Sequence, residues 1–149
     1  MNLKTAHLNA NYTSRPTQIL GSLDLRIVKN RLLDMGYEKM LLNGALIEQF
    51  SEGIYLFVDD DVVHWLEAYL HLEELLLSKE PYKHAAFLND GALTIKASVV
   101  AEQANVEFRY CPGLNVANLI TYNASIAADQ YIWWWRNIAY AILNLSGVK

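Results

Sequence analysis

The sequence predicts an α+β domain in which one antiparallel β-sheet packs against about three α-helices. Three observations support this prediction. Short apolar segments are separated by turn signals such as Asn89-Asp90-Gly91, as in hairpin-connected strands. Residues 62–77 repeat apolar side chains at helical spacing, and residues 125–145 form a second apolar, aromatic segment of helical length. All 149 residues fit a single domain.

The N-terminal quarter is predicted to contain an extended arm followed by a helix. Residues 1–17 are polar and rich in asparagine, which is typical of an arm or linker. A helix is predicted over residues 22–35, with Ser22 as its N-cap and Gly36 just beyond its end. Residues 23–27 also alternate apolar and charged side chains, so the sequence leaves a strand open for this segment.

The next segment is predicted to be β-structure that leads into a long helix. Residues 40–58 contain tight-turn signals and end in the almost wholly apolar run Ile54–Val58, which we expect to be a strand. Asp59-Asp60-Asp61 then ends the strand and offers an N-cap. The helix itself is expected over Val62–Leu77, because apolar residues occupy one broad face of it.

The C-terminal half is predicted to complete the sheet and to end in a helix. Three strands are expected, at about Ala85–Leu88, Ala92–Val100 and Val106–Tyr110. A short strand near Leu119–Tyr122 adds to the sheet. The last helix is expected to run from a Ser125 cap to about Leu145, with Gly147 after its end.

Several function classes are excluded by what the sequence lacks. Cys111 is the single cysteine, so a disulfide framework and a cysteine-rich zinc site are both excluded. No glycine-rich phosphate loop or serine-hydrolase motif occurs, and we expect no cofactor and no catalytic residues. The first residues contain no apolar signal segment, and Arg136-Asn137 interrupts the longest apolar stretches. We therefore expect a cytoplasmic protein with no membrane partner.

Charge is distributed unevenly along the chain. Residues 48–80 contain nine acidic residues and one lysine, a balance of −8, whereas the flanking segments balance at +3 and +1. Such a block repels nucleic acid and attracts basic proteins. The competing interpretation is a solvated hairpin and helix side. As partner-binding acids we assign Glu48, Glu52, Asp59, Asp60, Asp61, Glu67 and Glu74.

A polar stripe on the predicted helix could carry chemistry. His64, Glu67, His71 and Glu74 fall within about 80° of one helix face, where imidazoles and carboxylates can bind a metal or exchange protons. The competing interpretation is a solvated stripe with favourable neighbouring pairs. Cys111 would act as a nucleophile only if a histidine approached it, and is otherwise a small apolar filler.

Three consecutive tryptophans mark the last helix. At 100° per residue their indole rings cover about 200° of its circumference, which is more than one buried stripe can hold. Trp133 falls on a mixed polar face together with Tyr140, whereas Trp134 and Trp135 fall among apolar residues. Either the helix is enclosed on nearly all sides, or Trp133 and Tyr140 bind a partner.

A small acidic α+β domain with surplus aromatics and no catalytic motif resembles the immunity proteins of bacterial toxin systems. The resemblance implies a protein-binding inhibitor rather than an enzyme, which neutralises a basic toxin or nucleic-acid-processing enzyme through its acidic surface. The alternative is a small metal-dependent hydrolase that uses His64, Glu67 and His71. A scaffold subunit and a homodimer also remain open.

Overall fold

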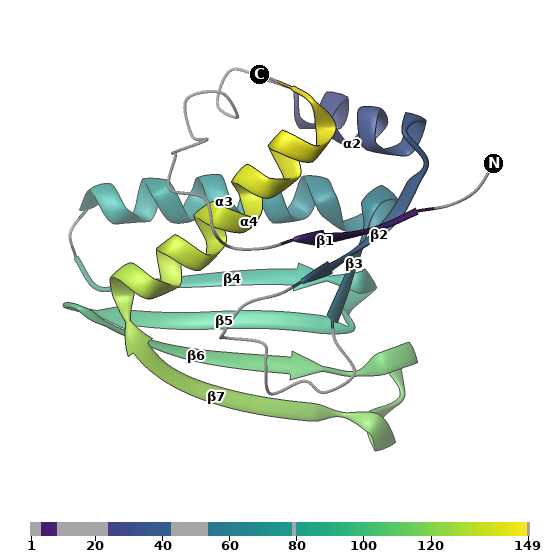
Figure 1. The fold of residues 1–149 in the computed structure, drawn as a ribbon. Helices are drawn as coiled ribbons and strands as arrows, with labels where there is room; N and C mark the ends of the chain where they lie inside the picture. Colours follow the sequence, from purple (N-terminus) through teal and green to yellow (C-terminus); the bar gives the residue numbers. More distant parts are fainter. Residues whose placement is uncertain (1–3, 9–23, 43–53, 79, 149) are drawn as a thin grey trace.

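A computed structural model describes residues 4–8, 24–42, 54–78 and 80–148 (Figure 1). Within these ranges the α+β class is confirmed, with three α-helices and seven strands. The helices are α2 (Leu25–Asp34), α3 (Val58–Ser78) and α4 (Ala128–Ser146). The strands are β1 (Lys4–Leu8), β2 (Tyr37–Leu42), β3 (Ile54–Phe57), β4 (Tyr82–Leu88), β5 (Leu93–Val100), β6 (Gln103–Tyr110) and β7 (Ile120–Ala127).

The strands form two sheets rather than the one that the sequence predicts. In the N-terminal sheet, β2 lies between β1, to which it is parallel, and β3, to which it is antiparallel. The second sheet, which we call the meander sheet, has the order β4-β5-β6-β7 with every neighbouring pair antiparallel. The 21 residues of α3 separate β3 from β4, so no short hairpin connects the two sheets.

α3 and α4 cover one face of the meander sheet, and its other face is open (Figure 1). Buried and accessible side chains alternate along β4, β5 and β6, as they do in a sheet with one covered face. α3 lies beside β4, α4 crosses from the end of β7 towards α2, and the helices share one hydrophobic core with the sheet. The apolar face predicted for residues 62–77 is part of this core: Val62, Trp65, Leu66, Tyr69 and Leu72 are fully buried.

The segment after the N-terminal arm is a helix, so the alternative of a strand over residues 23–27 is wrong. α2 begins at Leu25 and its N-cap is Asp24, whose carboxylate accepts a hydrogen bond of 3.0 Å from the Arg26 backbone N–H. The expected cap, Ser22, lies outside the described residues. Gly36 follows the helix with a φ of +91°, a conformation that favours glycine.

α3 begins at Val58, four residues before the predicted start at Val62. The three aspartates therefore form its first turn rather than a cap that precedes it. Asp61 accepts hydrogen bonds from the backbone N–H groups of Phe57, at 2.7 Å, and Asn89, at 2.6 Å. One carboxylate thereby ties the start of α3 both to β3 and to the turn after β4.

The last strand and the last helix divide at a different residue from the one predicted. β7 extends to Ala127 because all eight of its residues pair with β6. Ser125 lies inside this strand, where its hydroxyl accepts a hydrogen bond of 2.6 Å from the Gln103 side chain, so it is not a helix cap. α4 ends at Ser146 and Gly147 follows it, as predicted, in the left-handed conformation expected after a helix C-terminus.

The structure gives the three tryptophans different environments. Trp134 and Trp135 are buried, with 3% and 0% of their surface exposed, whereas Trp133 is 46% exposed. We predict that Trp134→Ala lowers the free energy of unfolding by about 3–5 kcal/mol. Trp133→Ala should cost less than about half as much, because it removes fewer buried contacts. Denaturant titration of both variants checks this, and equal large losses would contradict it.

Candidate functional site

The predicted acidic stripe lies on the exposed side of α3. Asp60, His64, Glu67, His71 and Glu74 are all exposed and follow one another at intervals of four and three residues. Residues at this spacing lie along one line on a helix surface. We call this line, together with Asp59, the α3 acidic face.

Two histidines lie between the carboxylates of this face. His64 Nδ1 is 4.0 Å from Glu67 Oε2, and His71 Nδ1 is 3.9 Å from Glu74 Oε2. Both pairs are exposed on both sides, so each contributes little to stability. The arrangement matches the solvated stripe with neighbouring pairs that was one interpretation of the sequence.

The other predicted acids differ in their accessibility. Asp59 is exposed, and its carboxylate lies 3.3 Å from Lys29 Nζ of α2. Asp61 is only 1% exposed, and both of its oxygens accept backbone hydrogen bonds, so it does not belong to the contact surface predicted for it. Burial raises the pKa of this carboxyl, against the effect of the two hydrogen bonds. Glu48 and Glu52 lie outside the described residues.

An ion pair that the sequence analysis missed joins α3 to α4. Glu73 Oε1 accepts hydrogen bonds from Arg136, at 2.6 and 2.8 Å, and from the Tyr69 hydroxyl, at 2.7 Å. Both charged side chains are largely buried. Glu73 is therefore neutralised within the fold and adds nothing to the α3 acidic face. The sequence did carry a signal, because Glu73 falls within the apolar face of residues 62–77 and Arg136 interrupts the apolar segment of the last helix.

The aromatic residues predicted for binding lie next to this ion pair. Trp133 and Tyr140 are three residues before and four residues after Arg136, so they share its side of α4. Trp133 is exposed and Tyr140 is half-buried. The two aromatics therefore lie on the side of α4 that carries Arg136, whereas Glu73, to which Arg136 bonds, lies on a different side of α3 from the α3 acidic face.

His84 is a buried polar residue whose role the sequence did not reveal. Its Nε2 lies 2.8 Å from the Ala68 carbonyl oxygen, which can only accept, so Nε2 carries the proton. Nδ1 then accepts a hydrogen bond of 2.8 Å from the Tyr131 hydroxyl. Burial lowers the pKa of His84 to about 4, so the ring is neutral at pH 7. His84 links β4, α3 and α4 through neutral hydrogen bonds.

The structure separates the groups that nucleophilic catalysis would require. Cys111 donates its backbone N–H to Ala92, at one end of β5, whereas His84 pairs with Ala97. Ala92 and Ala97 are five residues apart, which is about 17 Å along a strand, so the thiol of Cys111 and the ring of His84 lie far from each other. Within residues 4–8, 24–42, 54–78 and 80–148, no group of three His, Cys, Asp or Glu side chains is placed to hold a metal ion.

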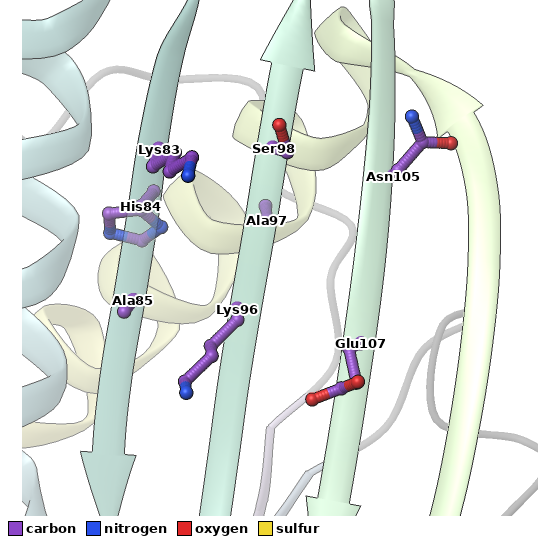
Figure 2. A pocket seen from close by; sticks show the side chains of 8 residues that line it. All are labelled: Lys83, His84, Ala85, Lys96, Ala97, Ser98, Asn105 and Glu107. Atoms are coloured by element: carbon purple, nitrogen blue, oxygen red, sulfur yellow. The ribbon is translucent and has the colours of Figure 1, made fainter.

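The open face of the meander sheet carries a shallow depression of about 330 Å³ (Figure 2). Its floor is made by small side chains such as Ala85 and Ser98, and longer polar side chains of β4, β5 and β6 surround it. Lys83 and Lys96 outnumber Glu107 there, so this surface has the opposite sign to the α3 acidic face. The residues that line it are Lys83, His84, Ala85, Lys96, Ala97, Ser98, Asn105 and Glu107.

Comparisons with protein-family models, with curated proteins and with solved structures find no match for this chain. No α-helix in the described ranges is both long enough and apolar enough to cross a membrane.

The environment of His84 predicts how stability depends on pH. Its pKa falls from an ordinary 6.5 to about 4 on folding, so unfolding takes up a proton between these values. The contribution of neutral His84 is therefore complete above pH 6.5 and lost as the pH falls towards 4, a change of about 3 kcal/mol.

The His84→Gln variant isolates this effect. Glutamine can donate to Ala68 and accept from Tyr131 without titrating, while Asp61 titrates in both proteins. Wild type should be the more stable protein at pH 7, and its advantage should shrink by about 3 kcal/mol by pH 4. Urea titrations across this range measure the difference. An advantage that stays constant with pH would contradict the prediction.

Proposed function

We propose that this chain is a protein-binding inhibitor, of the immunity type, that neutralises a basic toxin or nucleic-acid-processing enzyme. The proposed contact surface comprises the α3 acidic face and, on α4, the aromatic anchors Trp133 and Tyr140. Asp61 is omitted from this surface because it is buried.

The observation that carries the proposal is the row of carboxylates along α3. Asp60, Glu67 and Glu74 are exposed and span about 21 Å of helix. None of the three has a Lys or Arg nitrogen within 4.0 Å among the described residues. A rigid row of unneutralised charges attracts a cationic surface and accelerates association with it.

In this proposal Trp133 and Tyr140 of α4 supply the other part of the protein interface. Charged rows raise the association rate, whereas the stability of a complex comes mainly from buried aromatic anchors. Trp133 exposes part of its apolar ring to water in the free chain. Burial of this surface by a partner would stabilise the complex. The metal-dependent hydrolase ranks second because no metal-binding group is assembled in the described ranges.

The central experiment isolates the binding partner and measures how its association depends on salt. The immobilised chain is exposed to lysate of its source cells at low salt, and the retained protein is identified and purified. We predict that this partner is basic and that its association rate falls steeply from about 50 to 500 mM salt as charges are screened. A partner whose association rate ignores salt would overturn the proposal.

A pair of charge-matched variants locates the surface. Glu67→Gln with Glu74→Gln should slow association about threefold to tenfold, because two steering charges are lost. Glu102→Gln, in the turn between β5 and β6, together with Glu107→Gln on β6 makes the same charge change at the meander sheet and should leave the rate near that of wild type. Stopped-flow measurements at low salt compare them. Equal slowing by both pairs would show that only net charge matters.

The histidines distinguish the inhibitor from the hydrolase. His64→Ala with His71→Ala should leave partner binding and the melting temperature nearly unchanged, because both rings are exposed and only loosely paired. Loss of function with an unchanged melting temperature would favour the hydrolase.

A further inference from the structure

The outer edge of β7 is the least protected sheet edge in the described structure. β7 has eight residues, contains no charged residue and no proline, and pairs with β6 without a register shift. Natural proteins block such edges with charges, prolines or bulges, because free backbone groups recruit other strands. Among the residues that the structure describes, no strand pairs with the outer side of β7.

The other edges differ from β7 in ways that limit pairing. β3 has only four residues, and β1 has five and a register shift next to Lys4. β4 contains Lys83 and lies beside α3 (Figure 1). Only β7 offers a long, regular and uncharged edge within the described ranges.

The hydrogen-bond register shows which backbone groups of β7 point outward. Ala128 donates its N–H to the Glu102 carbonyl, and β7 continues in the same register from there, with each residue one step back along β7 pairing one step forward along β6. Even-numbered residues therefore bond to β6, and the N–H and C=O groups of Thr121, Asn123 and Ser125 face outward. Their side chains lie on the open face of the meander sheet.

We propose that a second copy of this chain pairs with β7, antiparallel and centred at Asn123, and joins two meander sheets into one. In this register Asn123 pairs with Asn123, and Thr121 pairs with Ser125. The outward backbone groups then form about six hydrogen bonds across a twofold axis. An uncharged strand creates no repulsion between the copies, although the whole chain carries a net charge of −4.

The side chains match this register on both faces. On the helix-covered face, Ile120 of one copy lies opposite Ile126 of the other, and both are incompletely buried in one copy. On the open face, small polar side chains lie opposite one another. Apolar side chains also remain exposed just before β7, at Leu114, Val116 and Leu119, beside the partner's end of the strand.

The dimer leaves the proposed partner surface accessible. β7 and β4 are opposite edges of the meander sheet, and α3 lies beside β4. Failure of the dimer would therefore leave the proposed inhibitor function untouched, and the reverse also holds.

Sedimentation equilibrium of the full chain tests the proposal. At about 100 µM, a dimer with a Kd near 1 µM would contain most of the protein. A wild-type chain that remains monomeric at this concentration would overturn the inference.

Charge variants at the axis then test the register. Asn123→Lys or Asn123→Glu places like charges directly opposite each other and should weaken the dimer at least about tenfold. An equimolar mixture of the two variants should restore dimerisation. Ala85→Lys, which adds a charge to the same open face on β4, should leave the dimer unchanged. A dimer that ignores both Asn123 variants would show that the interface lies elsewhere.

Amide exchange supplies a readout specific to residues. In wild type at high concentration, the N–H groups of Thr121, Asn123 and Ser125 should be protected from exchange with solvent. In Asn123→Lys they should exchange fast, while the N–H groups of Tyr122 and Ala124 stay protected by β6. Fast exchange of the outward amides in a wild-type dimer would overturn the β7 interface.

Discussion

The fold depends on aromatic packing where α3, α4 and the meander sheet meet. Trp65 of α3 stacks on Trp135 of α4 with ring centroids 3.9 Å apart, and Trp134 meets Trp65 edge to face at 5.4 Å. His84 of β4 also contacts Trp135 edge to face. Large rigid rings bury much apolar area with few rotamers to restrict, so a few contacts fix three elements relative to one another. The helix layer and the sheet are thereby locked into one core.

This core determines where charges can lie. Some polar groups inside it are paired through neutral hydrogen bonds, as at His84 and Tyr131, or through a close ion pair, as at Glu73 and Arg136. The carboxylates without a partner in the core lie on the side of α3 that faces solvent. The same packing that stabilises the fold therefore produces the row of acids proposed to bind a basic partner. That row is rigid because its helix is anchored by Trp65, Tyr69 and Leu72 on the opposite side.

The meander sheet has unequal faces and unequal edges. Its inner face is filled by helices, while its open face carries small polar side chains and a weakly basic depression. α3 lies beside the β4 edge, and β7 has no strand on its outer side among the described residues. This asymmetry separates two surfaces by the width of the sheet, so binding at α3 and self-association at β7 can occur independently.

The sequence alone determined the α+β class, the hairpin turn at Asn89-Asp90-Gly91 and the buried face of α3, because these depend on local periodicity and turn residues. It also separated Trp133 from its neighbours, because helical geometry fixes their directions. Only the tertiary structure decided that the strands form two sheets, that Asp61 is buried and that His84 is neutral. Each of these depends on contacts between residues distant in sequence, such as Asp61 with Asn89 and His84 with Tyr131. A local pattern records which residues are polar, whereas burial and partners depend on how the elements pack.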